Sequence, residues 1–430
     1  MYEVHSQSAV QVSRRGLRRR DFLRAIPLAG LAAGTLNWTD MVTVNADELR
    51  KQGKACILLW MQGGPSQLDT FSPKPGHVNG GETKGMKTAV SGIEISEHLP
   101  EVAKVMKDLC IIRSMNSKEG SHPRATYLMH TGYLPTATVK FPTLGATVAK
   151  EIGPTSSELP SFVRIGQGRI NDSAGLLGVD YDPFLMQQAG KLPDNTGLTT
   201  TKDRYNRRLN LLSKLETDFA SRGGSQEVTD HQKLYSQTAR MVLSPQMSGF
   251  DIDKEPQKVR EAYGDSQFGK GCLLARRLIE TGVTFVEVTL GNWDTHFDNF
   301  DKCKDLCTQL DKPFAALIND LKQRGLLDST LVVWMGEFGR TPKINPRSGR
   351  DHYPRAFNVA LAGGGVKGGQ VIGTTSASGE DVKDRPVGVT DLFQTICHSL
   401  KINAAKENQS SIGRPIKVVD GGEVVREVFG

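Results

Sequence analysis

The sequence lacks any long hydrophobic run and has no strong excess of one charge. The apolar stretch at 25–36 is shorter than the about 20 residues that a transmembrane helix needs. No later segment is longer and as apolar, so we expect no integral membrane segment in the mature chain. The net charge of +7 falls to +4 without the six Arg and three acidic residues of 1–46. This mild, dispersed charge excludes nucleic acid as an expected partner.

Cysteine is scarce, with six residues in a chain of 430. Cys303 and Cys307 are one helical turn apart and would suit a pair of metal ligands. They also continue an apolar helical stripe, which favours packing in the core. An even number of cysteines would permit disulfides in an oxidising compartment, but the spacing assigns none.

The N-terminus is typical of an export signal. The segment 19–24, RRDFLR, precedes the apolar stretch and resembles the twin-arginine pattern R-R-x-F-L-K. The small residues VNA at 44–46 offer a cleavage site. We therefore predict a twin-arginine signal peptide at 1–46 and a single domain at 47–430, exported folded to a periplasmic or extracellular location. The alternative is a plain basic amphipathic tail.

Short, nearly continuous apolar runs alternate with helical patterns along the rest of the chain. This alternation predicts an α/β sandwich with a mostly parallel central sheet flanked by helices. The charged segment 202–243 predicts an inserted helical hairpin, broken at Gly223-Gly224-Ser225. The expected strands are 55–62, 108–115, 284–290, 329–336 and 357–364, and the expected helices are 100–106, 268–280, 302–324 and 389–400.

Polar residues typical of metal sites follow four of the expected strands. In open α/β sheets, ligands bind at the carboxyl ends of the strands. The stretch TLGNWDTHFDN at 289–299 is either half of a metal site or a polar turn with Asx capping. The convergence favours a metal site, because three of only nine histidines fall at these ends. The residues concerned are Asp69, His122, Asp294, His296, Glu337, Asp351 and His352.

Five motifs together resemble a known family. They are LLWMQGGPSQLDTFSPKP, SHPRATYLMHTGYLP, GNWDTHFDN, GEFGRTP and GRDHYP. With the twin-arginine-like start, they are similar to the exported bacterial family called domain of unknown function fifteen hundred and one, within the alkaline phosphatase/sulfatase superfamily. The resemblance covers nearly the whole mature chain. It implies an alkaline phosphatase-like sandwich, hydrolysis of phosphate or sulfate esters, and divalent metals.

The resemblance also implies a metal site made of Asp294, His296 and His352. Three such nitrogen and oxygen ligands suit zinc, with one position open for water or substrate. The spacing departs from the superfamily, in which the Asp and His are usually further apart than in this Asp-x-His.

The second metal site of the superfamily is incomplete in this sequence. Gln62 stands where an Asp is expected after the first strand, and Glu337-Phe338 stands where Asp-His is expected. A second metal would need Asp69 and Glu337 as oxygen ligands, which suit magnesium, manganese or calcium.

The segment SHPRATYLMHTG resembles the sulfatase pattern C-x-P-S-R…TG, without its cysteine. Ser121 or Thr126 could act as the nucleophile if a metal lowered the pKa of its hydroxyl. Arg124 could hold an anionic group through two hydrogen bonds. The alternative roles are helix N-capping and packing for the two hydroxyl residues.

Two function classes follow from these residues. The first is an exported metal-dependent hydrolase whose substrate is an anionic phosphate or sulfate ester. The second is a non-catalytic binding or assembly subunit that keeps the superfamily scaffold. The cluster of Asp, His and Arg residues favours the first class, and the missing Asp and Cys favour the second. A metal assay on protein purified without chelator separates them.

Overall fold

The structure is a computed structural model that describes residues 53–154, 157–167, 173–193, 196–410 and 412–430. All of these residues belong to one unit, Leu49–Gly430. The predicted signal peptide at 1–46 lies outside the described residues. Within the described part of the chain, no helix has both the length and the apolar character that a membrane crossing requires.

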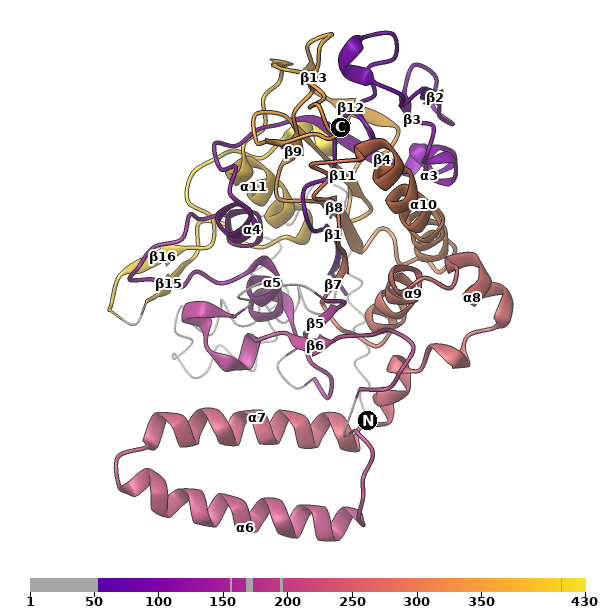
Figure 1. The fold of residues 1–430 in the computed structure, drawn as a ribbon. Helices are drawn as coiled ribbons and strands as arrows, with labels where there is room; N and C mark the ends of the chain where they lie inside the picture. The colour runs from indigo at the N-terminus through magenta and orange to yellow at the C-terminus, as the bar shows by residue number, and fades with distance from the viewer. Residues whose placement is uncertain (1–52, 155–156, 168–172, 194–195, 411) are drawn as a thin grey trace, which may run out of the picture. The chain divides into compact units, whose positions relative to one another are not determined.

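An eight-stranded sheet lies at the centre of this unit (Figure 1). Its order is β12-β4-β11-β8-β1-β7-β5-β6. Among these strands only β11 runs antiparallel to its neighbours, β4 and β8. The prediction of a mostly parallel central sheet is therefore confirmed, and all five expected strands form. The strands are β1 (Ala55–Met61), β4 (Leu109–Met115), β5 (Phe162–Ile165), β6 (Phe184–Met186), β7 (Phe285–Leu290), β8 (Thr330–Met335), β11 (Phe357–Ala362) and β12 (Gln370–Ile372).

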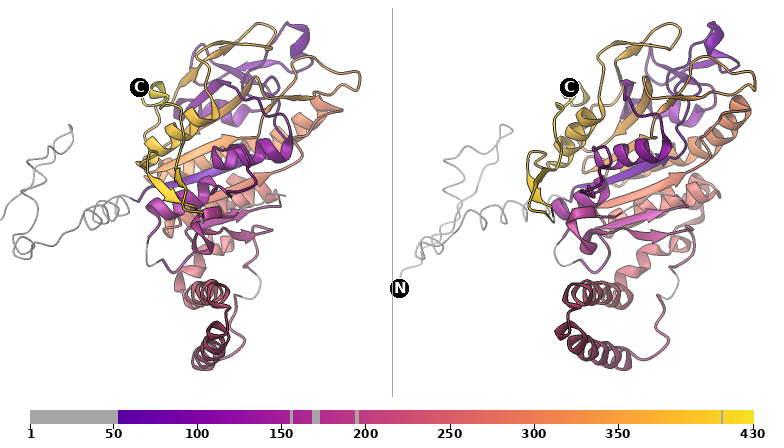
Figure 2. Two further views of the ribbon diagram at one scale, coloured as in Figure 1. Left: turned by 90° about the vertical axis from the view of Figure 1, so that its left-hand side faces the viewer. Right: turned by 60° about the vertical axis from the view of Figure 1, so that its left-hand side comes forward.

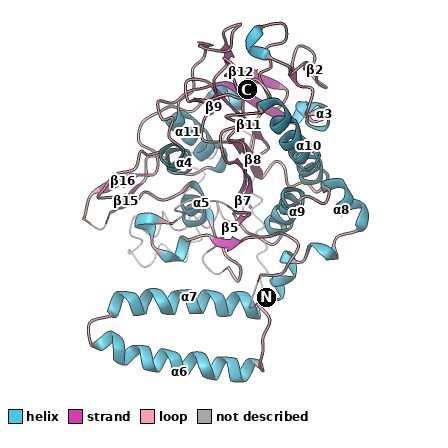
Figure 3. Ribbon diagram, in the orientation of Figure 1, coloured by secondary structure: helices cyan, strands magenta, loops and turns pink. Residues whose placement is uncertain are grey.

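Helices cover both faces of the sheet, because successive side chains of each buried strand enter opposite cores. On β1, Ile57 and Leu59 lie in the core shared with α3, α8, α9 and α10, whereas Leu58 and Trp60 lie in the core shared with α4, α5 and α11. Figure 3 shows the two helical layers on either side of the strands, and Figure 2 gives two further views. The helices are α3 (Pro100–Lys104), α4 (His122–Thr131), α5 (Leu144–Ile152), α8 (Gln257–Tyr263), α9 (Gln267–Glu280), α10 (Asn299–Gln323) and α11 (Val389–Leu400).

Four small two-stranded sheets complete the strand pattern. One of them, β9 (Gly339–Arg340) with β10 (His352–Tyr353), lies between β8 and β11 in the sequence and pairs His352 with Arg340. The others are β2 (Gly85–Lys87) with β3 (Glu94–Ser96), β13 (Thr374–Thr375) with β14 (Val382–Asp384), and β15 (Glu407–Gln409) with β16 (Pro415–Lys417).

The segment 202–243 forms the expected helical hairpin. Helix α6 (Lys202–Ser221) and helix α7 (Ser225–Leu243) lie side by side, and the chain turns at Gly223, whose φ is 117° (Figure 1). No residue of α6 is buried, and its side chains Leu211, Leu215 and Phe219 are exposed. Helix α7 packs through Met241 and pairs Lys233 with Asp180 at 3.0 Å.

All six cysteines are free and buried. Cys303 and Cys307 lie in the core on α10, so the packing interpretation holds for this pair. Burial raises the pKa of both thiols well above the ordinary range, because an apolar environment disfavours the thiolate. Neither thiol belongs to a group of three potential metal ligands in the described part of the chain.

Candidate metal centre

Three histidines and one aspartate meet at the carboxyl edge of the sheet. Asp294 follows β7, His122 begins helix α4 beyond β4, and His352 lies on β10. The ring nitrogen Nε2 of His122, of His296 and of His352 lies 3.4, 3.1 and 3.5 Å from Asp294 Oδ1, respectively. His296 Nε2 and His352 Nε2 are 3.0 Å apart. We call these four residues the His/Asp cluster.

The other ring nitrogen of each histidine faces a hydrogen-bond acceptor. His122 Nδ1 lies 2.7 Å from Glu337 Oε1, and His296 Nδ1 lies 2.8 Å from Asp351 Oδ1. His352 Nδ1 lies 2.8 Å from the carbonyl oxygen of Gly120. Because a carbonyl or carboxylate oxygen can only accept, each Nδ1 carries the proton. Each Nε2 therefore presents a lone pair towards the cluster, the orientation that ligating histidines adopt.

Glu337 and Gly63 hold two parts of the cluster in position, the His122 ring and the loop that carries Asp294. Glu337 is buried, and its Oε1 also accepts from the backbone N–H of Gly63 at 2.9 Å. Gly63 has a φ of 114°, and a Cβ at this residue would lie 2.5 Å from the backbone nitrogen of Asp294. A larger residue at position 63 would push the Asp294 loop away, so the close approach requires glycine.

Arg340 supplies a buried positive charge next to Asp294. Its guanidinium donates to Asp294 Oδ1 at 2.6 Å and to the carbonyl oxygens of Gly63 and Gly64. Burial by itself raises the pKa of Asp294, but the hydrogen bond and the charge of Arg340 outweigh it, so the pKa lies below its ordinary value. Asp294 is therefore a carboxylate at neutral pH.

The histidines of the cluster differ in basicity. Burial lowers the pKa of His122, but the hydrogen bond and the charge of Glu337 raise it more, and the net shift is upwards. The pKa of His352 is lowered, because burial disfavours its charged form and the charges of His122 and Arg340 add to this effect. Neutral His352 can act as a ligand over a wide pH range.

The chemistry of these groups fits a divalent cation. His296 Nε2 and His352 Nε2 lie only 3.0 Å apart, and a cation that accepts a lone pair from each would stabilise this arrangement. His122 Nε2 is buried without a hydrogen-bond partner among the described residues. One ligand atom from each of His122, Asp294 and His352 lies within 4.8 Å of the other two. Imidazole and carboxylate ligands of this kind are typical of zinc.

The structure brings together most of the residues singled out in the sequence. Asp294, His296 and His352 are neighbours, as the proposed metal site requires. Glu337 lies beside the cluster as the acceptor for His122, and its Oε2 is buried without a partner among the described residues. His122 was recognised only as a strand-end residue and not as a ligand. Its position after β4, on the same sheet edge, was the available signal.

Asp69 does not join the cluster. Its carboxylate is fully buried and accepts from Ser66 and Thr83 at 2.5 Å each, and from Asn299 and Arg350 at 2.8 Å each. Three of these donors share Oδ2 and Thr83 binds Oδ1, so the carboxylate belongs to a buried hydrogen-bond network. In the described chain no other group of three potential ligands exists, so we leave Asp69 and a second metal out of the candidate site.

Ser121 and Arg124 are also less central than their motif suggested. Ser121 is the exposed N-cap residue of α4, and Arg124 is half-exposed and donates to Glu119 at 2.7 Å. Neither residue lines the cavity beside the cluster. Thr126, one helical turn after His122, does line it.

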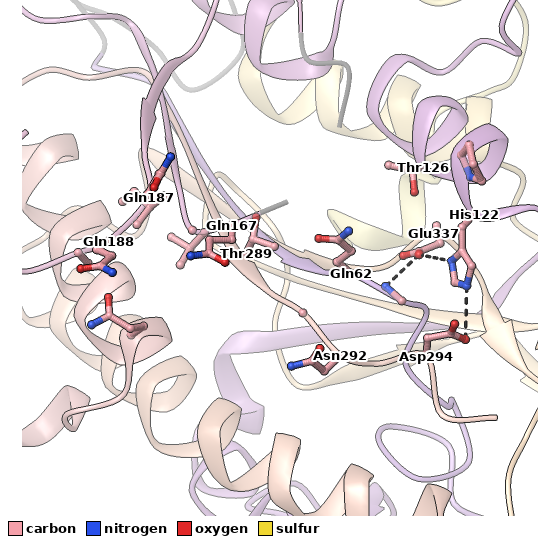
Figure 4. A pocket seen from close by; sticks show the side chains of 18 residues that line it. Gln62, His122, Thr126, Gln167, Gln187, Gln188, Thr289, Asn292, Asp294 and Glu337 are labelled. Carbon is pink, nitrogen blue, oxygen red and sulfur yellow. Dashed lines mark hydrogen bonds and ion pairs between the residues drawn. The ribbon is translucent and has the colours of Figure 1, made fainter. Parts of the chain in front are cut away.

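A cavity of about 930 Å³ opens beside the His/Asp cluster. Figure 4 shows His122, Asp294 and Glu337 at one end of it, joined by dashed interactions. A row of amide side chains leads away from this end. The cavity is large enough for a ligand of drug size or more. Its walls are formed mainly by residues that follow β1, β5, β6 and β7.

Comparison with solved structures finds matches at low sequence identity. The PsFucS1 sulfatase from Pseudoalteromonas sp. matches at 12% identity and a TM-score of 0.40, over 92% of this chain and 80% of that chain. An alkaline phosphatase superfamily protein from Vibrio parahaemolyticus matches at 12% and 0.37, over 86% and 76%. The phosphonate monoester hydrolase of Agrobacterium radiobacter matches at 12% and 0.33, over 87% and 77%.

Comparison with curated proteins gives no match. A family model, by contrast, spans almost all of the described chain, from residue 53 to residue 429. That span includes every residue of the His/Asp cluster and every strand of the central sheet. The chain therefore belongs to the family described as "Protein of unknown function (DUF1501)".

Proposed function

We propose that this protein is an exported, metal-dependent hydrolase of phosphate or sulfate esters. The observation that supports the proposal is the convergence of three histidine Nε2 atoms on Asp294 Oδ1. Every Nδ1 in the cluster is held by an acceptor, so the ring orientations are fixed in advance. A polar turn would not need three separate segments to supply such oriented rings.

His122, Asp294 and His352 would hold the metal, together with His296. Zinc fits this ligand set best. When bound, the cation supplies a Lewis acid that neutralises the charge of an anionic ester. As ligands, Asp294 would bring one negative charge and each histidine one ring nitrogen.

The protein's own groups prepare this end of the cavity. Glu337 holds the His122 ring through one hydrogen bond and stays buried, which keeps its charge near the site. Arg340 keeps Asp294 ionised. Thr126 lies on the same face of α4 as His122, because residues four apart on a helix are neighbours. Its hydroxyl is the candidate nucleophile that lines the cavity, and a water molecule is the alternative attacking group.

Arg340 also supports the second function class. The ion pair with Asp294 at 2.6 Å already neutralises this carboxylate without a metal. A scaffold that only binds a ligand would keep such a pair. Metal content decides between the two classes.

The experiment is turnover of p-nitrophenyl phosphate and p-nitrophenyl sulfate by protein purified without chelator. Metal content is measured on the same sample by mass spectrometry. We expect bound zinc and release of p-nitrophenol from at least one ester, lost in His296→Ala. Thr126→Val should abolish turnover if Thr126 attacks, and should keep much of it if water attacks. Metal-loaded protein that hydrolyses neither ester would contradict the proposal.

Export is proposed from the RRDFLR segment at 19–24, outside the described residues. A twin-arginine signal carries folded proteins across the membrane, which suits a protein that binds its metal before export. The mature domain would then act in a periplasmic or extracellular location.

A further inference from the structure

The cavity carries a row of amide side chains that the proposed chemistry does not use. Five of them lie within two residues of the carboxyl ends of neighbouring strands: in sheet order, one each after β1, β7 and β5, and two after β6. Three interstrand spacings of about 4.8 Å give this row a length of about 14 Å. It starts beside the His/Asp cluster and extends away from it (Figure 4). The amides belong to Gln62, Gln167, Gln187, Gln188, Gln267 and Asn292.

These six amide groups are available to a ligand. None of their side chains makes a hydrogen bond to another described residue, and the described glutamines at 167, 187, 188 and 267 are exposed. An amide offers two donors and one acceptor oxygen, so each group has unused capacity on both sides.

The backbone conformation of Asn292 also indicates a ligand site. Its φ is 73°, in the left-handed region that is unfavourable for most residues and better tolerated by asparagine. Residues held in this region cluster at ligand sites, where the surrounding structure maintains them. The turn lies two residues before Asp294 and joins the amide row to the His/Asp cluster.

We infer that the amide row binds the hydroxyl groups of an oligosaccharide, which carries the ester that the metal centre hydrolyses. This inference rests on the proposed function for the ester and adds the class of the alcohol. A hydroxyl, like an amide, both donates and accepts, so successive hydroxyls can pair with successive amides.

The length of the row sets the size of the ligand. A span of about 14 Å is longer than one sugar ring, so the row contacts at least two. Binding energy from sugar units far from the ester can then support the reaction at the cluster. Short esters would therefore be poor substrates compared with the esters of an oligosaccharide.

The test is isothermal titration calorimetry of the whole protein in EDTA, with neutral tetrasaccharides of glucose, galactose and mannose. We expect at least one of the three to bind. The double variant Gln187→Leu/Gln188→Leu should bind it about tenfold or more weakly, because each lost hydrogen bond weakens binding about fivefold. Gln226→Leu is the matched control, since Gln226 is exposed on α7 and does not line the cavity.

Three results would overturn the inference: no binding of any tetrasaccharide, unchanged affinity in the double variant, or tighter binding of tetraglycine than of every tetrasaccharide. The chelator makes the assay independent of turnover. Tetrasaccharide binding by a protein that hydrolyses no ester would therefore refute only the proposed function. Ester hydrolysis without tetrasaccharide binding would refute only the inference that the amide row binds an oligosaccharide.

Discussion

If the His/Asp cluster holds zinc, removing one of its ligands should abolish about half or more of the stabilisation that the bound zinc gives. At a free zinc concentration one hundred times the dissociation constant, binding to the folded state adds about 2.7 kcal/mol. Unfolding a unit of roughly 380 residues has an entropy of about 0.8 kcal/mol per kelvin, so Tm should rise by about 3 °C.

His352→Ala removes a nitrogen that lies 3.0 Å from His296 Nε2 and 3.5 Å from Asp294 Oδ1. We expect a loss of affinity of roughly tenfold or more, at least as large as that from losing an orienting group around a metal. At the same zinc concentration the rise in Tm should fall below about 2 °C. His398→Ala is the matched control, because His398 is exposed on α11 and outside the cluster.

The assay is thermal unfolding followed by fluorescence, with and without zinc, together with zinc content by mass spectrometry. Comparing each protein with its own chelated form removes any general loss of stability caused by the substitution. If His352→Ala keeps the full zinc-dependent rise in Tm, the cluster is a hydrogen-bond network and not a metal site.

Three further predictions concern other parts of the chain. Asp69→Asn should lower the free energy of unfolding by about 3 kcal/mol, because it leaves the buried Arg350 without its carboxylate partner. Zinc content should not change, and a loss of zinc would show that Asp69 belongs to the metal site. Burial raises the pKa of Glu287, but the charges of His130 and Arg164 lower it more, so its net pKa is lowered. The stability that this carboxylate contributes is therefore present above about pH 4.3 and is lost as the pH falls through the lowered pKa. Glu287→Gln should cost about 3–5 kcal/mol at pH 7 and flatten the acid limb of a denaturation profile, whereas an unchanged acid limb would argue against this role. Changing both Arg19 and Arg20 to Lys should leave the precursor in the cytoplasm by cell fractionation, because the export receptor reads the arginine pair and not the charge; normal export would exclude the signal.

Sequence patterns were sufficient for five of the eight strands of the central sheet, because long apolar runs mark strands that are buried on both faces. The short strands β5, β6 and β12 were missed. Runs such as ACILLWM have no polar residue to confuse the pattern, so β1 is found almost to the residue. Helix α10 was expected at 302 and begins at Asn299. Asn299 is polar but buried, and its amide donates to Asp69 at 2.8 Å. Periodicity does not register such a residue, since its burial depends on a partner 230 positions away.

The site was only partly accessible from the sequence. Asp294 and His296 share one short motif, and His352 lies in a second one, so their types and strand-end positions were informative. The sequence did not show that His122 joins the cluster and Asp69 does not, because both residues follow a strand. Asp69 turns into a buried network with Arg350, whereas His122 is turned towards Asp294 by the start of α4. Such choices depend on which way a loop folds back, and local sequence does not determine that.

The reversed direction of β11 has a consequence for how this protein can vary. Because β8 and β11 are antiparallel neighbours, residues 336–356 leave the sheet and return to it at the same edge. This connection, which carries Glu337, Arg340 and His352, never has to cross a helical layer. Insertions between β9 and β10 would therefore lengthen a loop beside the His/Asp cluster, where Asp351 contacts His296, while the strands on either side keep their packing. Chains of different length in this stretch would share one sheet and differ in the ligands that they admit.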